Sequence, residues 1–508
     1  MSARGPNDRH VPPKGGLAAG SAAWLGLLRR LLWLGLALLA LGFVAAAITR
    51  RLNFDEALAL RAGWLTVQRL AAAPPFYMPT TWLLGVLGSA VADPGAVMLI
   101  ARLAVVATVG PALAWALAAS GRATTGALAA ALVLSQATFV VHGLEFRYDW
   151  AILLGWLLAY PLVLRRRPWD FAWLGLLAAW LAAHHLKGLY FAVCLTALAA
   201  VAASAEERSR RHLARLAAGL AGGLLAWVTW SALLGFGEDL GTVYTTFFGL
   251  AAGAESRVAP WVSLAGTFRR DTVWWLGALL AVIATIWRLP RSHLQLVAGR
   301  DLWTLGFALA PLGFLFLHPH PWAYMLVLPA PFLALLMAQR LVAAAPRPKP
   351  VLVTAALTLV LALQWAATRS SPWQEYFDAL AAPRERQVAT LRLLRERQVE
   401  GDRIFDPSGL AYFVEPCIGE WYLDTLFEER AKRGLWMGEL RQLDLASCPW
   451  MLNTYRLRML PDDLEARLGG SYVLIDGGGG LALQADDPRL AGTRSWPGLT
   501  YRELVSFW

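Results

Sequence analysis

Charged residues, cysteines and nucleotide-binding motifs are all scarce in this sequence. Charged residues make up 16% of the 508 positions against 57% hydrophobic ones, which excludes a soluble protein and indicates a multi-span membrane protein. No Walker loop, dinucleotide-binding glycine motif or Cys-x-x-Cys pair occurs, so nucleotide chemistry is disfavoured. The net charge is +11, but residues 371–508 hold 16 Lys and Arg against 21 Asp and Glu, leaving 30 against 14 elsewhere. The basic excess therefore belongs to the membrane body, and no nucleic-acid partner is expected.

Only three cysteines are present. Cys194 lies in an apolar segment, whereas Cys417 and Cys448 lie in the charged carboxyl-terminal part. The latter two could form a disulfide if that part faces an oxidising compartment, although the sequence does not fix their distance in space.

Eleven apolar segments are expected to cross the membrane. The first, Trp24 to Ala47, would extend over roughly 36 Å as a helix, enough to cross a bilayer. It is longer than the apolar core of a cleaved signal peptide, so it is interpreted as an uncleaved anchor that follows a cytoplasmic segment, residues 1–23. The other predicted spans lie at about residues 95–118, 124–142, 149–164, 171–186, 188–203, 213–235, 273–288, 303–317, 322–340 and 350–368.

Arginine-rich loops alternate along this series and set the predicted orientation. These loops are expected in the cytoplasm, which places the amino terminus there and the loop after the first span outside. Because the number of spans is odd, the carboxyl-terminal part then also lies outside. The basic residues of the predicted cytoplasmic loops are Arg122, Arg165, Arg166, Arg167, Arg208, Arg210, Arg211, Arg288, Arg291, Arg300, Arg340, Arg347 and Lys349.

The composition divides the chain into an all-α polytopic membrane domain and a small α/β domain outside the membrane. The α/β domain is expected to begin with a helix rich in Arg and Glu, followed by short strand-like runs. The predicted boundaries are 24–368 for the membrane domain, with long outer loops at 48–94 and 236–272, and 371–508 for the extracytoplasmic α/β domain.

The first outer loop carries two adjacent acids, Asp55 and Glu56, directly after the first span. A general base needs a carboxylate beside the group that it deprotonates, and two acids together can raise one pKa or share a metal ion. The alternative is that both acids open a solvated helix in the membrane interface. This helix is expected to be followed by a turn at Pro74 and Pro75 and by a second interfacial helix.

Further charged side chains are expected at the same membrane level. Glu145, Arg147 and Asp149 could bind a phosphate, a sugar or a metal ion, or could form a local ion pair at a helix end. Lys187 lies between two apolar runs, where it either binds a phosphate or snorkels to the interface. Arg102, inside a span, is expected to be the buried partner of an acid or of a phosphate.

A late outer loop contains His318-Pro-His320-Pro-Trp-Ala-Tyr324. Two histidines two positions apart could bind a metal ion, but this pattern alone is a weak signal. The alternative is a rigid turn with aromatic residues in the membrane interface.

Taken in order, these motifs resemble one family. The series is Asp55-Glu56-Ala-Leu-Ala-Leu-Arg61 after a first span, the Pro-Pro-Phe-Tyr turn, Ala101-Arg102-Leu103, Glu145-Phe-Arg147-Tyr-Asp149 at the opening of a span, and Tyr324 with Pro329. Over about residues 24–345 the chain is similar to glycosyltransferases of the GT-C fold that use a polyprenyl-phosphate sugar. This group includes protein O-mannosyltransferases and lipid A aminoarabinose transferases.

The resemblance implies a site built from the residues named above. Asp55 corresponds to the catalytic base, with Glu56 and Asp149 as further catalytic acids. Family members often carry a basic residue after the proline turn, where this chain has Met78-Pro79-Thr80-Thr81. The residues expected to bind the donor phosphate are Arg147, Lys187, His320, Tyr324 and Arg102. Arg257, Arg269 and Arg270 are further candidates for the cation that binds it. Whether Asp55, Glu145 and Asp149 hold a divalent metal ion stays open.

The resemblance also implies an inverting transferase in a bacterial inner membrane, with its active site and α/β domain on the periplasmic side. Its partners would be a polyprenyl-phosphate-linked sugar and a lipid, glycan or protein acceptor. A rival from another class is a transporter or lipid flippase, which needs ionisable residues near the bilayer midplane. A third interpretation is an inactive scaffold whose outer domain binds a partner.

Overall fold

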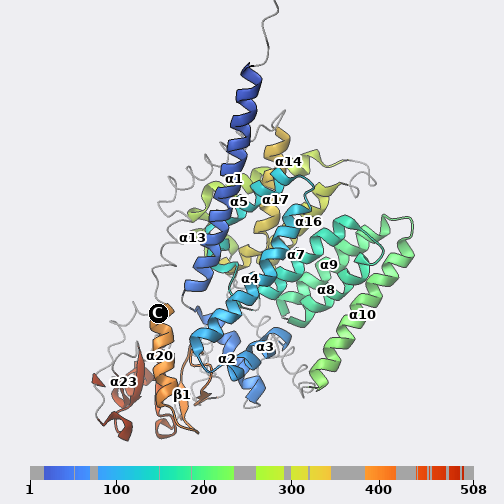
Figure 1. The fold of residues 1–508 in the computed structure, drawn as a ribbon. Coiled ribbons are helices and arrows are strands. Elements are labelled where there is room, and N and C mark those ends of the chain that lie inside the picture. Colours follow the sequence, from blue (N-terminus) through green and yellow to red (C-terminus); the bar gives the residue numbers. More distant parts are fainter. Residues whose placement is uncertain are drawn as a thin grey trace, which may run out of the picture.

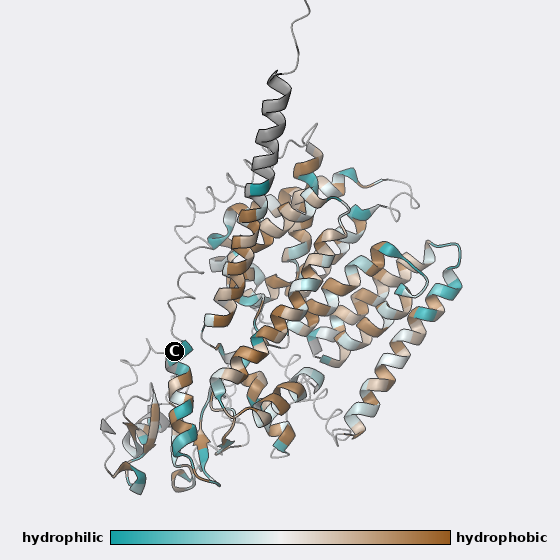
Figure 2. Ribbon diagram, in the orientation of Figure 1, coloured by the Kyte–Doolittle hydropathy of each residue, from teal (hydrophilic) through white to brown (hydrophobic). Residues whose placement is uncertain are grey.

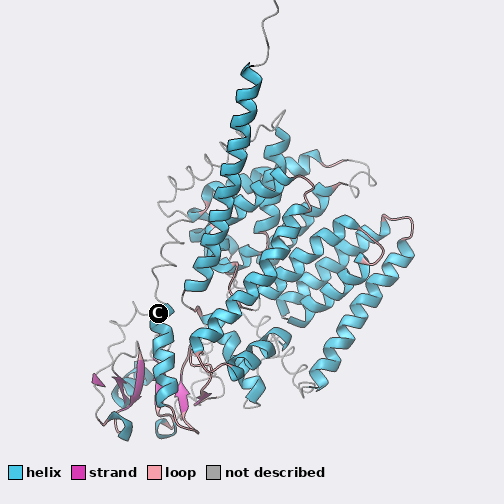
Figure 3. Cartoon of the chain, in the orientation of Figure 1, coloured by secondary structure: helices cyan, strands magenta, loops and turns pink. Residues whose placement is uncertain are grey.

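Long helices with a small sheet at one end make up the computed structural model of the chain (Figures 1 and 3). The six strands lie beside helix α20, at the lower left of Figure 3. The structure describes residues 16–50, 52–68, 78–147, 149–184, 186–233, 259–290, 299–318, 321–344, 384–418, 442, 444–452, 454, 457, 460, 462–475, 480–491 and 495–496.

Apolar helices form the larger domain, which is mostly brown in the hydropathy colours of Figure 2. Four described helices are long and apolar enough to cross a membrane, namely α4, α9, α10 and α16. Shorter apolar stretches occur in α1, α5, α8, α14 and α17. The helix lengths therefore do not establish the predicted total of eleven spans. The last predicted span, residues 350–368, lies outside the described part of the chain. The bounds are α1 Gly16–Thr49, α4 Pro94–Ala118, α7 Asp149–Arg165, α8 Asp170–His184, α9 Leu186–Ser204, α10 Ser209–Leu233, α12 Pro260–Ser263, α13 Ala265–Arg270, α14 Thr272–Arg288 and α16 Arg300–Leu317.

Two predicted spans are interrupted. Residues 124–142 divide into α5 (Ala123–Leu134) and α6 (Ala137–His142), because the Gln136 side chain caps α6 and accepts a hydrogen bond from Phe139 N at 2.7 Å. Residues 322–340 begin with the 3-10 helix η2 (Ala323–Val327), and α17 (Ala330–Ala344) starts only after Pro329. The shorter elements matter for the site, because α6 ends at His142 and η2 carries Tyr324.

The segment predicted as the first outer loop contains two helices, as expected from the sequence. These are α2 (Phe54–Gln68) and α3 (Met78–Ala90), and the proline turn between them lies outside the described residues. They cross at Gly63 and Gly85, where a Cβ atom on either residue would overlap with backbone of the other helix. Glycine at both positions therefore allows the close approach that holds α2 against α3.

The carboxyl-terminal domain has a mixed six-stranded sheet in the order β2-β1-β3-β5-β4-β6. Strand β1 pairs in parallel with β2 and β3, whereas the β3–β5, β5–β4 and β4–β6 pairs are antiparallel. The predicted Arg- and Glu-rich helix is α20 (Arg384–Arg397), which lies beside the larger domain in Figure 1. The other bounds are β1 Arg403–Phe405, β2 Glu415–Pro416, η3 Leu445–Ser447, β3 Trp450–Leu452, α23 Asp462–Ser471, β4 Tyr472–Ile475, β5 Leu481–Gln484, η5 Pro488–Leu490 and β6 Ser495–Trp496.

Cys417 and Cys448, which the sequence left open as a pair, form a disulfide. Their Cα atoms are 5.7 Å apart and 31 positions separate them in the chain. Both residues are buried, and they join the end of β2 to the residues before β3. The bond therefore links the ends of the chain segment between β2 and β3, the two strands that flank β1 in the sheet.

We expect Cys417→Ser to destabilise the carboxyl-terminal domain by roughly 3–4 kcal/mol, because a bond that closes a loop of this length restricts the unfolded chain. Thermal denaturation of the full chain in detergent measures the change. Cys194→Ser is the matched control, since Cys194 is a free cysteine in α9. Equal melting temperatures for the two variants would contradict the stabilising role.

Candidate active site

Helix α2 begins with a capping box. The Asn53 side chain accepts a hydrogen bond from Glu56 N at 2.9 Å, and Glu56 Oε2 accepts one from Asn53 N at 3.2 Å. Glu56 is fully buried, whereas the Asp55 side chain keeps 26% of its surface exposed. Neighbouring residues of a helix point about 100° apart, so the two adjacent acids separate into an inward and an outward carboxylate.

The inward carboxylate, Glu56, pairs with Arg102 from α4. Arg102 donates to Glu56 Oε1 at 3.2 Å and to Oε2 at 2.8 Å, and Phe146 N donates to Oε1 at 3.3 Å. Arg102 also donates to the carbonyl oxygen of Arg50. Two residues predicted for different roles, one catalytic and one for a phosphate, thus lie together in a buried pair that fixes the start of α2.

The outward carboxylate, Asp55, contacts Arg147. The distance from Arg147 Nη2 to Asp55 Oδ2 is 2.5 Å, and the same guanidinium lies 3.1 Å from Glu145 Oε2 and 3.3 Å from Asp149 Oδ2. The guanidinium carbon lies 3.4 Å from the centre of the Tyr324 ring. Arg147 is only 2% exposed, and the three carboxylates hold its pKa well above the ordinary value although burial by itself would lower it.

Lys187 completes the cluster from the start of α9. Its Nζ donates to the Tyr324 hydroxyl at 2.9 Å and lies 3.6 Å from Asp149 Oδ1. The structure therefore brings together five residues that the sequence predicted for the site, and they come from α2, the loop before α7, α7, α9 and η2. They are Asp55, Arg147, Asp149, Lys187 and Tyr324.

Glu145 lies on the other side of Arg147. It accepts from Arg50 Nη2 at 3.0 Å, and its Oε2 lies 3.0 Å from His142 Nδ1. Burial would raise the pKa of Glu145, but the charges of His142, Arg50 and Arg147 hold it well below its usual range. His142 was not predicted from the sequence, although its position three residues before Glu145 places both side chains on one side of the turn that leads to the site.

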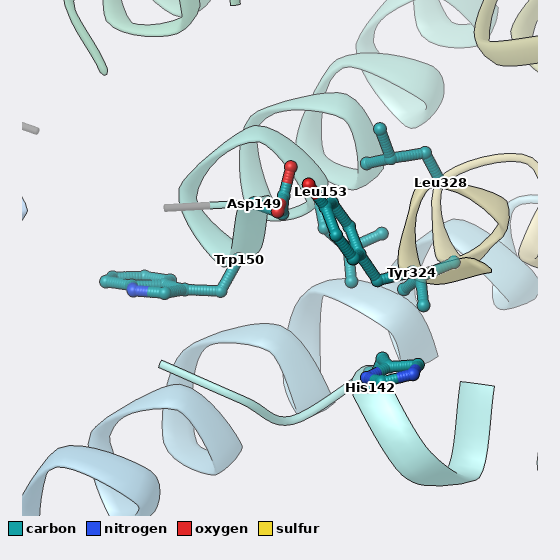
Figure 4. A pocket seen from close by; sticks show the side chains of 8 residues that line it. His142, Asp149, Trp150, Leu153, Tyr324 and Leu328 are labelled. Atoms are coloured by element: carbon teal, nitrogen blue, oxygen red, sulfur yellow. The ribbon is translucent and has the colours of Figure 1, made fainter. Parts of the chain in front are cut away.

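A small pocket opens between these elements (Figure 4). His142 and Asp149 lie on either side of Tyr324 there, and Trp150, Leu153, Val327 and Leu328 supply apolar walls. The cavity volume is about 10 Å³, which is room for about one water molecule. In this conformation the charged groups therefore contact one another more than they face open space.

The three carboxylates that the sequence left open as metal ligands surround a guanidinium. The guanidinium of Arg147 lies among Asp55, Glu145 and Asp149 and contacts each of them. Within the described ranges, no three His, Cys, Asp or Glu side chains are grouped so that they could hold a metal ion. In this arrangement the three carboxylates are paired with a cation of the protein itself, and metal binding stays a prediction.

Other candidates for the phosphate-binding cation lie elsewhere or outside the described residues. Arg270, at the end of α13, donates to Thr138 Oγ1 at 3.2 Å, and its neighbour Arg269 is exposed. His320 and Arg257 fall outside the described residues. Among the described candidates, Arg147 and Lys187 are the two that lie with Asp55 and Tyr324.

Comparison with known proteins gave structural likenesses only. No protein-family model and no curated protein matches the sequence. ArnT from Cupriavidus metallidurans, solved bound to undecaprenyl phosphate, is 15% identical with a TM-score of 0.47, covering 77% of this chain and 74% of that one. The apo oligosaccharyltransferase of Archaeoglobus fulgidus is 13% identical with a TM-score of 0.43, covering 87% and 72%.

A further similar structure is the oligosaccharyltransferase AglB from Archaeoglobus fulgidus in complex with an inhibitory peptide and a dolichol-phosphate. It is 10% identical with a TM-score of 0.41, covering 92% of this chain and 77% of that one. These solved structures are GT-C glycosyltransferases, the group that the sequence motifs resemble. At such low identity and TM-score, the residues of the site rather than these likenesses carry the evidence about function.

We expect the stability of the protein to fall in acid partly through Glu145. Because its folded-state pKa is lowered, its contribution is complete above the unfolded value of about 4.3 and is lost as the pH falls below that value. The melting temperatures of wild type and Glu145→Gln should therefore differ at pH 7, and the difference should shrink progressively as the pH falls below about 5. Glu385→Gln, at an exposed position on α20, is the control, and a difference that stays constant with pH would contradict the assignment.

Proposed function

We propose that this chain is an integral membrane glycosyltransferase that moves a sugar from a polyprenyl-phosphate donor to an acceptor on the outer face of the membrane. The acceptor is a lipid, a glycan or a protein. The observation that carries the proposal is the contact of the partly exposed Asp55 with a cluster that also contains Arg147, Lys187 and Tyr324. The proposed base and the two cations proposed to bind phosphate therefore belong to one cluster, which lies just after the first predicted span.

In the proposed reaction, an acceptor hydroxyl or amine attacks the anomeric carbon of the donor sugar from the face opposite the phosphate. The acceptor proton passes to the Asp55 carboxylate. The bond between the anomeric carbon and the phosphate oxygen breaks, and its electron pair stays on the departing polyprenyl phosphate. A single displacement of this kind inverts the anomeric configuration.

Arg147 and Lys187 are proposed to bind the phosphate. The donor is a phosphodiester with one negative charge, and the leaving group is a monoester that gains charge as the bond breaks, so two cations stabilise the transition state more than the bound donor. Phosphate binding would draw Arg147 away from Asp55, which it contacts at 2.5 Å. The Asp55 carboxylate would then be free to accept a proton when donor is present.

The other residues of the cluster are proposed to position the base Asp55 and the two cations, Arg147 and Lys187. Asp149 lies 3.3 Å from Arg147 and 3.6 Å from Lys187, so it orients both cations. Tyr324 lies under Arg147 and accepts a hydrogen bond from Lys187. The Glu56–Arg102 pair holds the first turn of α2 from inside, which makes both residues positioning residues in this mechanism.

We expect Asp55→Asn to release polyprenyl phosphate at least about 100-fold more slowly than wild type, as for the removal of a general base. The assay uses purified protein in lipid nanodiscs, a panel of radiolabelled undecaprenyl-phosphate and dolichol-phosphate sugars, and a membrane extract as acceptor. Asp93→Asn is the matched control, because Asp93 is an exposed carboxylate with its own arginine partner, Arg392.

Equal rates for wild type and Asp55→Asn would assign the base to another residue, with Asp149 the next to test. Wild-type protein that releases no phosphate from any donor would contradict the transferase. A lipid-flipping assay on the same nanodiscs would then test the rival class of transporters and flippases.

We also expect Lys187→Gln to lower kcat/KM for the active donor by about 10²–10³-fold, because it removes a cation from the leaving phosphate. Lys187→Arg should retain more activity, since it keeps the charge. The measurement is the initial rate over a range of donor concentrations. Arg340→Gln removes a cation that pairs with Asp301 on α16 and is the control, and an unchanged rate for Lys187→Gln would contradict the phosphate-binding role.

A further inference from the structure

The carboxyl-terminal domain holds the polypeptide on both sides of Asp55. The first contact is made by Gln387 of α20, whose side-chain Oε1 accepts from Leu52 N at 2.7 Å and whose Nε2 donates to Leu52 O at 3.2 Å. Gln387 is 3% exposed and Leu52 is 4% exposed. Leu52 precedes the cap residue of α2 and belongs to no helix, so this side chain satisfies both of its buried backbone groups.

A neighbouring contact extends this attachment to the end of α1. Arg384 Nη1, one turn earlier on α20, donates to the carbonyl oxygen of Ile48 at 2.9 Å. Carbonyl groups in the last turn of a helix lack partners within the helix, so a cation that donates there stabilises the helix end. Helix α20 therefore fixes the short connection between α1 and α2.

The second contact lies further along α2, at Arg61. Its guanidinium donates to Asp406 Oδ2 at 3.2 Å, to Val414 O at 3.1 Å and to Ala411 O at 3.4 Å. Both members of the Arg61–Asp406 pair are fully buried. Burial lowers the pKa of Arg61 to about 10 while the Asp406 carboxylate opposes that change, so Arg61 keeps its charge near neutral pH.

The loop after β1 prepares Asp406 for this contact. Its carboxylate accepts hydrogen bonds from Ser408 N at 2.9 Å, Ser408 Oγ at 2.6 Å, Gly409 N at 3.1 Å and Ala411 N at 2.7 Å. Because four donors of its own loop fix the orientation of the Asp406 carboxylate, Arg61 can pair with it in only one position. The position of α2 is therefore tied to the fold of the carboxyl-terminal domain.

We infer that Gln387 and Asp406 are positioning residues for Asp55, and that the carboxyl-terminal domain sets the orientation of the proposed base. Asp55 lies three residues after Leu52 and six residues before Arg61, so a shift at either contact moves its carboxylate relative to Arg147. A displacement of about 1 Å from the productive geometry can cost roughly 100-fold in rate. This inference rests on the proposed function for its catalytic consequence, but not for the restraint on α2.

The domain also touches the membrane domain at a point that does not involve α2. Arg392 of α20 forms a two-point ion pair with Asp93, at 2.7 and 2.9 Å, where Asp93 caps the start of α4. This pair is exposed at both ends. Arg392→Gln is therefore a matched control, because it loosens the same helix against the same domain away from the segment that carries Asp55.

The test compares Gln387→Met with Arg392→Gln in the full-length protein. Methionine has nearly the volume of glutamine but cannot make either bond to Leu52, and the change leaves the buried Arg61–Asp406 pair intact. We expect hydrogen exchange of the backbone amides in residues 52–61 to accelerate in Gln387→Met and to stay at the wild-type rate in Arg392→Gln. Exchange that is unchanged in Gln387→Met would overturn the inference.

The catalytic consequence is measured with whichever polyprenyl-phosphate sugar wild type turns over. We expect Gln387→Met to lower kcat by roughly 10- to 100-fold with little change in the donor KM, and Gln387→Glu, which keeps the acceptor for Leu52 N, to recover part of the loss. A kcat equal to that of Arg392→Gln would overturn the positioning role. Hydrogen exchange needs no substrate. An inactive wild type would therefore contradict the proposed function, whereas the exchange rates would still show whether Gln387 restrains α2.

Discussion

The buried guanidinium of Arg147 is the constraint on which the site depends. A charge that is 2% exposed needs partners close by, since an unpaired ion in such surroundings costs several kcal/mol. Its partners are Asp55 of α2 and, two residues away on either side in the chain, Glu145 and Asp149. The pairing therefore brings the start of α2 to the turn that leads into α7. The same interaction that compensates the charge brings together groups that the proposed reaction requires.

Helix α2 is held by three ion pairs that point to three different neighbours. Asp55 faces Arg147, Glu56 faces Arg102 of α4, and Arg61 faces Asp406 of the carboxyl-terminal domain. The last two pairs are fully buried, whereas Asp55 keeps part of its surface exposed. A helix fixed on two sides by closed pairs presents its third charged residue in a defined direction. This arrangement suits the proposed base, because its carboxylate has to keep one orientation toward the substrate.

Much of the site could be predicted from sequence, because position along the chain sets the membrane level. Asp55, Arg147, Asp149, Lys187 and Tyr324 each flank an apolar segment on the same predicted side. In the structure these side chains lie together. The order of the motifs is also what makes the sequence resemble the GT-C glycosyltransferases. His142 was missed because a single histidine at the end of an apolar helix has no distinguishing pattern.

Local sequence decided the apolar helices, the capping box at Asn53 and Glu56, and the separation of an outer α/β domain. These follow from hydrophobic length, helix-end hydrogen bonding and composition, which act over a few residues. Only the tertiary structure decided which acid meets which arginine. Glu56 pairs with Arg102, Arg61 reaches Asp406 across 345 positions, and Arg147 lies among the carboxylates of Asp55, Glu145 and Asp149. Such pairings depend on which helices pack together, because a charge can be compensated by any opposite charge within reach and the sequence offers several.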